Sequence, residues 1–569
     1  MNAPSTTVFR VHVVLALVVG SGLRMHDLAG QFVLSDEWHG PHAALNATWA
    51  ELAALLTLGA TSVPSNLYYE FLLGSIGLSE WTLRMPSVLA GVLAIGAIPW
   101  LLRRSIGDWA SMATAWLLAV SPLLVFYSRY ARPYALVVLL TFLAFLACRR
   151  WAATGHRSAG LAFVAAAVLA GYFHLLEVRS LLIPLVCLVA AKGIGPRLPM
   201  LRAEPSWRAI GCAGLAGCAA LALLFTPALL SPSERFFQIL GEDSPTAATL
   251  VSALALLGGT NGGAAFFVLL PLALLGTWRL VARDPWLGSL FAAVAIGCLV
   301  PVFGARPVDS DVALVFARYT IPLLPIGAVL LACGADLLIE WLDPWLREGF
   351  VRTSARSLAL FALVLGLAAA GPLPSLYSGA NAFTNHKAFH SSYEAVASDS
   401  ERFARFLEQM KWRGPPPNVA VSDFYRMLAD ETDEFALIEY PMPIGDLFSP
   451  GFIHQRIHGK QVLGGWVPRP APREERAPGV VYANWWVGDV LAGARRDRTH
   501  FRSLVSLRDR EAVRASGARY LVLHRDLRAE RLGWTPKPER LRIADTFEAN
   551  WGAPVFADTW ILVYDLRER

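Results

Sequence analysis

Two adjacent carboxylates, Asp36 and Glu37, follow a long apolar run near the start of the chain and precede Trp38. A carboxylate at the edge of an apolar layer is able to take a proton from a hydroxyl group, provided that the hydroxyl lies within hydrogen-bond distance. The same pair is equally typical of acidic residues at the N-terminus of a helix, which we expect near Gly40 and Pro41. Both interpretations stay open for this pair taken alone.

A second group stands between two apolar runs, in the segment 127–134, where Arg129 and Arg132 alternate with tyrosines that include Tyr134. Guanidinium groups present several N–H donors in a fixed plane, which suits phosphate oxygens, and aromatic rings offer surface to a lipid or a sugar. The alternative is a pair of snorkelling arginines within a belt of interfacial tyrosines. The short spacing predicts a very tight turn.

A third group is Arg318 and Tyr319, which open an apolar run after a loop that contains Arg306. Charged groups at the edge of a membrane are costly and therefore mark candidate functional sites. A weaker group, formed by His174, Glu177 and Arg179, lies between two further apolar runs. For that group a satisfied interfacial pair of acid and base is the alternative.

The composition excludes an ordinary soluble enzyme. The chain has 569 residues, of which 55% are hydrophobic and only 17% are charged, whereas a soluble chain is about 25% charged. The net charge of +6 comes from short basic clusters between apolar runs, which argues against a nucleic-acid partner. The six cysteines show no metal-binding spacing, and we expect them to be small hydrophobic core residues.

Apolar runs long enough to cross a bilayer predict about eleven transmembrane helices. They lie at roughly 8–30, 83–102, 109–128, 134–148, 158–174, 178–192, 209–228, 262–281, 287–303, 318–338 and 357–376. The segment 247–259 is either a further span or a helix on the surface. We therefore expect a transmembrane module over residues 1–376.

The distribution of Lys and Arg predicts the orientation of these spans. With the N-terminus in the cytoplasm, the inner turns contain the arginine pairs at 103–104 and 149–150, whereas the first outer loop has acids and no Lys or Arg between Met25 and Leu83. An odd number of spans then places the C-terminus outside. All three candidate groups fall on the outer face.

Beyond residue 376 the chain changes character. Charged residues, Pro and Gly become more frequent, and the apolar runs shorten to strand length at 418–422, 435–440, 480–482, 519–524 and 560–564. A helical pattern covers 393–411. We expect residues 377–569 to form a soluble α/β domain on the outer side of the membrane.

These motifs together resemble the membrane-embedded GT-C glycosyltransferases, in the branch of the protein O-mannosyltransferases and the aminoarabinose transferase ArnT. The resemblance covers residues 1–376 and rests on the acidic pair of the first outer loop, the Ala-Arg-Pro-Tyr turn at 131–134 and the Arg-Tyr-x-x-Pro-x-x-Pro segment at 318–325. It implies a polyprenyl-phosphate-linked sugar as donor and an inverting transfer to an acceptor hydroxyl. The C-terminal part resembles the soluble tails of bacterial members less specifically.

The resemblance also implies roles for individual residues. Asp36 matches the catalytic base and Glu37 its neighbour, Arg132 matches the arginine of the short outer turn, and Arg318 lies where an arginine meets the donor phosphate. With the residues of the same two segments, the predicted donor-phosphate set is Arg129, Arg132, Tyr134, Arg318 and Tyr319. The predicted lining set is His39, His42, His174, Glu177 and Arg306.

No metal or other cofactor is expected, because the resembled branch generally uses none. The alternative is a divalent cation held by Asp36, Glu37 and either His39 or His42, since carboxylates and imidazoles are suitable ligands.

We thus predict a glycosyltransferase of a bacterial plasma (inner) membrane whose partners are the bilayer, a polyprenyl-phosphate-linked sugar and an acceptor lipid, glycan or protein. The alternatives are a lipid or solute transporter and a non-catalytic lipid-binding scaffold. A transporter is expected to have two related halves, and the sequence shows no such internal repeat.

Overall fold

The structure is a computed structural model. It describes residues 6–26, 28, 37, 39–46, 48–55, 62–77, 79–195, 197–230, 244–260, 263–307, 310–342, 350–378, 422–433, 435–440, 458, 460–463, 480–482, 504–506, 510–515, 517–524, 543–558 and 561–567. The helix predicted at 393–411 and most of the strand predicted at 418–422 lie outside these residues.

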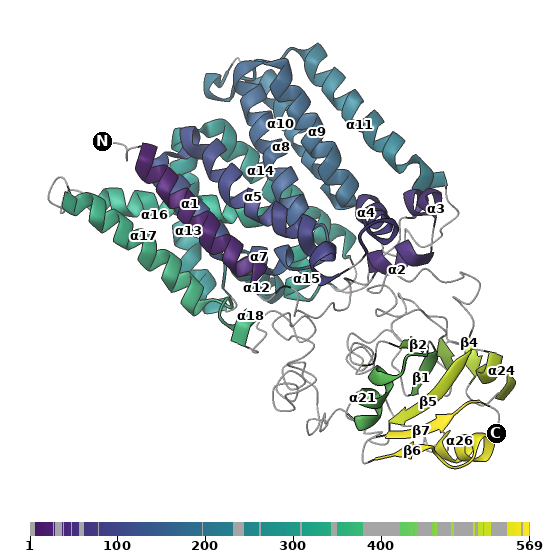
Figure 1. The fold of residues 1–569 in the computed structure, drawn as a ribbon. Coiled ribbons are helices and arrows are strands. Elements are labelled where there is room, and N and C mark those ends of the chain that lie inside the picture. The colour runs from purple at the N-terminus through teal and green to yellow at the C-terminus, as the bar shows by residue number, and fades with distance from the viewer. Residues whose placement is uncertain are drawn as a thin grey trace. The chain divides into compact units, whose positions relative to one another are not determined.

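The chain divides into two compact units, which are described separately (Figure 1). The first unit comprises residues 1–28, 53–65 and 84–376, and the second comprises residues 29–52, 66–83 and 377–569. The first is helical and the second contains the β-sheets. That residues 1–376 and 377–569 fold as separate domains stays a prediction.

The first unit is built from apolar helices. They are α1 (Thr6–Met25), α5 (Glu80–Ile106), α6 (Asp108–Val120), α7 (Pro122–Ser128), α8 (Tyr134–Thr154), α9 (Arg157–Phe173), α10 (Arg179–Ile194), α11 (Trp207–Leu230), α12 (Ala247–Leu257), α13 (Gly263–Arg283), α14 (Pro285–Ala305), α15 (Ala313–Tyr319), α16 (Leu323–Leu342), α17 (Phe350–Ala370) and α18 (Ser375–Ser378), with the short 3₁₀ helices η2 (Leu175–Val178) and η3 (Pro199–Leu201). In the described part of the chain, seven helices are long and apolar enough to cross a membrane, or eight if the bent pair α6–α7 is one span. The protein is a multi-pass membrane protein.

Every predicted apolar run coincides at least in part with a helix. The runs at 158–174, 178–192 and 357–376 fall on α9, α10 and α17, which are not among the seven or eight helices of the described chain that are long and apolar enough to cross a membrane. Two other runs are also corrected. The run predicted at 109–128 is broken into α6 and α7, and the run predicted to begin at residue 318 begins only at Leu323 because Arg318 and Tyr319 end the separate helix α15. Helix α12 has 11 residues, so it is about 16 Å long and too short to cross the hydrocarbon core alone.

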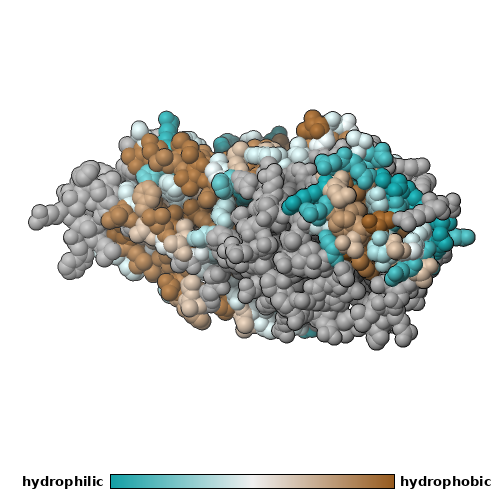
Figure 2. Space-filling view, turned by 60° about the horizontal axis from the view of Figure 1, so that its bottom comes forward, coloured by the Kyte–Doolittle hydropathy of each residue, from teal (hydrophilic) through white to brown (hydrophobic). Residues whose placement is uncertain are grey.

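The exterior of the helical unit is apolar, as a lipid environment requires. Figure 2 shows hydrophobic side chains over its surface. Exposed hydrophobic side chains of this unit include Val18 on α1, Leu223 on α11 and Val268 on α13, which are 64%, 75% and 74% exposed. These side chains would be unfavourable in water and are suited to acyl chains.

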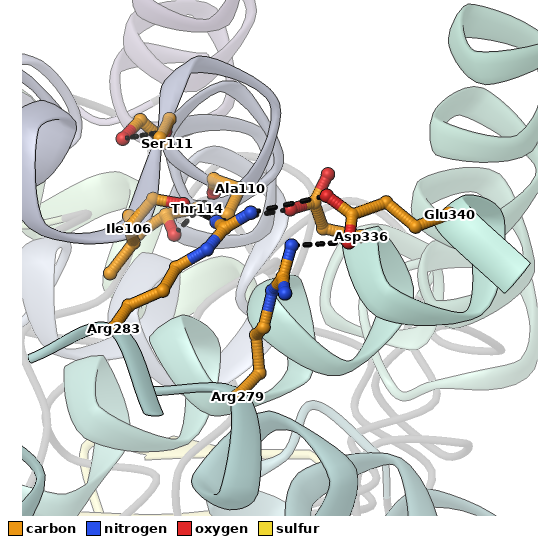
Figure 3. Close-up of polar contacts among 9 residues, drawn as sticks. Ile106, Ala110, Ser111, Thr114, Arg279, Arg283, Asp336 and Glu340 are labelled. Atoms are coloured by element: carbon orange, nitrogen blue, oxygen red, sulfur yellow. Dashed lines mark hydrogen bonds and ion pairs between the residues drawn. The ribbon is translucent and has the colours of Figure 1, made fainter. Parts of the chain in front are cut away.

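Helices α13 and α16 pack with their backbones in close contact. A Cβ atom on Gly276 would lie 1.8 Å from the carbonyl oxygen of Leu330, and one on Gly334 would lie 2.0 Å from that of Leu272. At one end of this pair, two arginines of α13 face two acids of α16 (Figure 3). Arg279 pairs with Glu340, and Arg283 lies 3.3 Å from Asp336, 3.2 Å from Glu340 and in hydrogen-bond contact with the last carbonyl of α5, that of Ile106.

The second unit contains a mixed five-stranded sheet in the order β2-β1-β5-β7-β6 and a two-stranded sheet of β3 and β4. In the large sheet β1 is parallel to β2 and β5, while β7 is antiparallel to β5 and β6. Its core includes Ile438, Leu521 and Phe547. The elements are β1 (Ala436–Tyr440), β2 (Gln461–Leu463), β3 (Val480–Tyr482), β4 (Leu504–Ser506), β5 (Ala518–His524), β6 (Phe556–Ala557), β7 (Ile561–Asp565), α21 (Asp423–Asp430), α24 (Arg510–Ala515) and α26 (Ile543–Trp551). The helices between α1 and α5 are α2 (His39–Asn46), α3 (Trp49–Ala54) and α4 (Val63–Gly74).

The predicted α/β character of the C-terminal part is confirmed. Four of the predicted strands correspond to β1, β3, β5 and β7, and alternate residues of β1 face the core. The residue Ser422, predicted as the end of a strand, is instead the N-cap of α21, where its hydroxyl accepts a hydrogen bond from the amide of Phe424.

Candidate active site

The site begins at a break in the helix pair α6–α7, which bends by 55°. Ser121 lies at the break, and its hydroxyl accepts a hydrogen bond from the amide of Leu124 at 3.4 Å. Pro122 follows as the first residue of α7, where a missing amide hydrogen costs nothing. The break leaves carbonyls at the end of α6 without partners inside the helix.

A buried arginine from a distant segment binds those carbonyls. Arg24 is 0% exposed, and it donates to the carbonyls of Leu118 and Ala119 at 3.1 and 3.0 Å and from Nε to the hydroxyl of Ser128 at 3.1 Å. Helix α5 passes close by at Gly91, where a Cβ atom would lie 2.0 Å from the Ser128 hydroxyl. Arg24 therefore fixes α1 to the break.

The predicted tight turn between α7 and α8 is confirmed, since α7 ends at Ser128 and α8 begins at Tyr134. Arg129 is 1% exposed and donates from one terminal nitrogen to the carbonyls of Leu23, Arg24 and His26, at 3.1, 3.2 and 2.6 Å. These contacts cap the C-terminus of α1. They give no support to the donor-phosphate role predicted for Arg129.

The neighbouring Arg132 has a different environment. Its carbonyl accepts a hydrogen bond at 2.8 Å from the hydroxyl of Ser87 on α5, so the turn is held by α5 as well as by α1. The side chain of Arg132 is 8% exposed and lies close enough to His174 for its charge to act on that imidazole.

The turn between α9 and α10 brings a second arginine to the same place. Arg179 pairs with the buried carboxylate of Glu177 at 2.6 Å and donates to the carbonyl of Tyr319 at 2.6 Å. Because Tyr319 is the last residue of α15, this contact joins α10 to α15.

Helix α15 contributes the third arginine. The guanidinium carbon of Arg318 lies 5.8 Å from the ring centroid of Tyr134 and 5.5 Å from that of Tyr319, within the range of cation–π attraction. The ring of Tyr134 in turn lies 5.8 Å from His174 and 4.7 Å from Tyr127, measured between centroids. We call Arg132, Tyr134, His174, Glu177, Arg179 and Arg318 the arginine cluster.

The pKa of His174 reflects its burial and the positive charge of the arginine cluster. His174 lies in the connection between α9 and η2. Burial, followed by the charges of Arg179, Arg318 and Arg132, lowers the pKa of His174 to about 3. The imidazole is therefore neutral at physiological pH. Since the charges that act on it are positive, the site favours an anion.

Comparison with known proteins gives two findings for this architecture. Residues 69–202 match the family model for dolichyl-phosphate-mannose-protein mannosyltransferase. Among solved structures, the chain is similar to apo ArnT from Cupriavidus metallidurans, with 14% identity over 99% of this chain and 98% of that chain and a TM-score of 0.53. No curated protein matches the chain in sequence.

Two further structures are similar at lower TM-scores. They are ArnT from Cupriavidus metallidurans bound to undecaprenyl phosphate (14% identity, 99% of each chain, TM-score 0.49) and the Archaeoglobus fulgidus oligosaccharyltransferase tethered to an acceptor peptide (13% identity, 95% of this chain and 72% of that chain, TM-score 0.46).

The likeness to apo ArnT extends over nearly the whole of both chains. The protein has the ArnT-like GT-C fold. The resemblance inferred from the sequence motifs is confirmed, and the segment that matches the family model contains every member of the arginine cluster except Arg318.

Of the lining residues predicted for the GT-C site, the structure brings His174 and Glu177 into the arginine cluster. Arg306 is instead the exposed C-cap of α14, with a φ of 45° in the left-handed region. Asp36 lies outside the described residues, as do the side chains of His39 and His42. Glu37 belongs to the second unit and is 1% exposed, so a pocket shared by the acids and the arginines stays a prediction.

The metal alternative also stays a prediction, because it depends on Asp36 and the two histidines. Among the side chains that the structure describes, no group of three His, Cys, Asp or Glu residues is arranged to hold a metal ion. The backbone does form the regular helix that the spacing of His39 and His42 requires, since α2 runs from His39 to Asn46 with Gly40 and Pro41 in its first turn.

Sequence reasoning did not single out two buried arginines of this GT-C bundle. Arg24 and Arg84 are both 0% exposed, and Arg84 donates to the carbonyl of Leu28 at 3.2 Å. The sequence feature that could have identified them is their position at the predicted outer end of a span, where the distribution of Lys and Arg disfavours an arginine. Arg179 was noted only beside His174 and Glu177, and no spacing rule connects it to Tyr319.

Proposed function

We propose that the protein is an inverting glycosyltransferase that moves a sugar from a polyprenyl-phosphate donor to an acceptor hydroxyl on the extracytoplasmic face of the membrane. The arginine cluster carries the proposal. It gathers three guanidinium groups from the α7–α8 turn, α10 and α15 around one neutral imidazole, in a bundle whose exterior suits lipid.

The chemistry that fits such a site is the departure of a phosphate. When the bond between the anomeric carbon and the phosphate oxygen breaks, negative charge develops on the phosphate oxygens, and fixed guanidinium groups in a partly dry site stabilise that charge. Arg318 and Arg132 are the proposed phosphate ligands. Arg179, which pairs with Glu177, is proposed to hold α10 and α15 in place around them.

The other half of the reaction belongs to the first outer loop. We propose that Asp36 takes the proton of the attacking hydroxyl, with Glu37 beside it. Attack from the face opposite the leaving phosphate inverts the anomeric carbon. We thus propose that the first loop supplies the base and that the arginines of the helical unit stabilise the negative charge on the leaving phosphate.

The nature of the donor is supported by the family match. The matched model is named for a mannosyltransferase that uses dolichyl phosphate mannose, a polyprenyl-phosphate-linked sugar, and the matched segment includes Arg132, Tyr134 and Arg179. We propose the same donor class here, without a metal, in a bacterial plasma membrane with the N-terminus in the cytoplasm. The acceptor is proposed to be a hydroxyl of a lipid, glycan or protein.

Mass analysis of the glycolipids and other glycoconjugates of a strain with and without the gene tests the proposal. Deletion is expected to remove one sugar unit from a defined product, and the wild-type gene restores it. Asp36→Asn, expressed in the membrane at the same level, is expected not to restore it. Unchanged masses after deletion would refute the glycosyltransferase, and full restoration by Asp36→Asn would remove Asp36 as the base.

The same strains distinguish a transporter from an enzyme. Purified protein in proteoliposomes is expected to convert a labelled lipid-linked sugar to a new product when acceptor lipids from the strain are present. Movement of the label across the bilayer without any change in its mass would support transport instead.

A further inference from the structure

His174 of the arginine cluster has a buried nitrogen that makes no hydrogen bond to the described part of the protein. His174 is 9% exposed, and its Nδ1 atom has no hydrogen-bond partner among the residues that the structure describes. Its ring lies against Tyr134, with 5.8 Å between centroids. A buried nitrogen without a partner is costly and calls for an explanation.

We propose that His174 is a donor-binding residue that hydrogen-bonds through Nδ1 to the phosphate group of the lipid-linked sugar. This inference rests on the proposed function and adds to Arg132 and Arg318 a third, uncharged ligand of the phosphate. A phosphate oxygen placed among Arg132, Arg179 and Arg318 would accept the N–H of an imidazole that carries its proton on Nδ1, and would satisfy this buried nitrogen.

The groups that face His174 determine its protonation state. They are Arg132 from the α7–α8 turn, Tyr134 from α8, Arg179 from α10 and Arg318 from α15, while the nearby carboxylate of Glu177 is paired with Arg179. Because burial and these arginines depress the pKa to about 3, the imidazole stays neutral above about pH 4. Its proposed role is therefore that of a hydrogen-bond donor and not of a proton donor to the leaving phosphate.

The choice of variants follows from the geometry of the imidazole. His174→Phe keeps a ring against Tyr134 and removes both nitrogens. The amide nitrogen of Asn occupies nearly the place of Nδ1, whereas that of Gln corresponds to Nε2. His156→Phe is the matched control, since His156 is an exposed histidine at the opposite end of α9.

The experiment measures the dissociation constant of undecaprenyl phosphate for the full-length protein in lipid nanodiscs. His174→Phe is expected to weaken binding about tenfold, as the loss of a hydrogen bond to a charged group does. His174→Asn is expected to bind within about threefold of wild type, since its amide replaces the same donor. His174→Gln is expected to resemble His174→Phe, and His156→Phe to bind as wild type.

Equal binding by folded His174→Phe and wild type would overturn the proposal. If His174→Phe does not fold, the affinities of His174→Asn and His174→Gln for undecaprenyl phosphate are compared instead. Wild-type affinity in His174→Gln but not in His174→Asn would overturn the assignment to Nδ1. Failure of the wild type itself to bind undecaprenyl phosphate would count against the proposed function as a whole.

The pH dependence separates a neutral ligand from an imidazolium. We compare the dissociation constant of His174→Phe with that of wild type as a ratio at each pH. Titration of the lipid phosphate changes both dissociation constants equally and therefore cancels in this ratio. For a neutral imidazole this ratio is expected to change by less than about twofold between pH 5.5 and pH 8. A ratio that rises steeply below pH 6.5 would show a charged His174 and overturn the neutral role.

Discussion

Arginines of the helical unit differ in what their guanidinium groups contact. Arg24 and Arg129 donate to backbone carbonyls at the ends of helices, whereas Arg318 faces the ring of Tyr134 and lies near His174. A guanidinium engaged by carbonyls stabilises the chain, and one that faces an aromatic ring and a neutral imidazole is placed to meet an anionic ligand. Arg318 is therefore the residue at which the donor site is best tested.

Arg318→Ala is expected to lower kcat/KM for the lipid-linked donor about 100-fold, the usual loss when one group that stabilises developing charge is removed. Arg318→Lys is expected to be intermediate, because lysine keeps the charge and lacks the planar group that lies over Tyr134. Initial rates at varied donor concentration measure the effect. Arg208→Ala, at an exposed position on α11, is the control, and an Arg318→Ala enzyme as active as this control would exclude Arg318 from the site.

The sequence predicted Arg132 and Arg318 because each is an arginine on the side of the membrane where the charge trend disfavours one. The same signal applied to Arg129, three residues before Arg132, whose donor-phosphate role stays a prediction. Only the fold shows that Arg129 points to the end of α1. Arg179 and Tyr319 are 140 residues apart, so their contact has no local signal.

At the scale of elements, the clearest departure from the predicted helices is the break between α6 and α7. Hydropathy alone predicts one span over 109–128, since both halves are equally apolar. The break is stable because Ser121 and Pro122 favour a helix start, and because Arg24 binds the carbonyls of Leu118 and Ala119. The second condition comes from α1, more than 90 residues away, and is not visible in the local sequence.

The packing of α5 against this break predicts a difference between two glycines of the same helix. At Gly91 a Cβ atom would lie 2.0 Å from the Ser128 hydroxyl and 2.8 Å from Nε of Arg24, whereas at Gly96 the nearest atom, of Leu17, is 3.6 Å away. Gly91→Ala is expected to cost about 1–3 kcal/mol of unfolding free energy by overpacking. Gly96→Ala is expected to be neutral or slightly stabilising.

Thermal unfolding of both glycine variants in the same detergent measures this difference. A Gly91→Ala protein as stable as Gly96→Ala would show that α5 does not pack closely on Arg24 and Ser128.

The ion pairs between α13 and α16 give a second prediction at this scale (Figure 3). Arg283→Ala removes one partner of Asp336, which is 8% exposed, and a donor to the carbonyl of Ile106. We expect a loss of about 2 kcal/mol, measured by unfolding in detergent. Arg202→Ala, which breaks the exposed pair with Glu204, is the control and is expected to cost less than about 0.5 kcal/mol.

A double variant identifies the cause of that loss. Arg283→Ala with Asp336→Ala is expected to be more stable than the sum of the two single losses predicts, because both single variants lose the same Arg283–Asp336 pair. Additive losses would show that the pair does not interact.

At the scale of the whole molecule, the two units are predicted to face different solvents. The helical unit exposes apolar side chains such as Val268 and Leu223, whereas the sheet of the second unit encloses a core of its own. The bias of Lys and Arg toward alternate turns predicts that the C-terminus is extracytoplasmic. The proposed reaction requires an extracytoplasmic arginine cluster, which lies at the end of the bundle where α1 and α7 end and α8 begins.

Reporter fusions test this orientation directly. Alkaline phosphatase is active only outside the cytoplasm, and fused after residue 569 it is expected to be active, whereas green fluorescent protein at the same position is expected to be dark. Fused after Gly155, in the turn between α8 and α9, the two reporters are expected to give the reverse result, because this turn follows the arginines at 149–150 and lies at the opposite end of α8 from the arginine cluster. A fluorescent fusion at residue 569 would place the sheet domain in the cytoplasm. The same pattern at both positions would contradict an odd number of crossings between the α8–α9 turn and the C-terminus. Active alkaline phosphatase after Gly155 would contradict the outer location of the arginine cluster, which lies at the opposite end of α8.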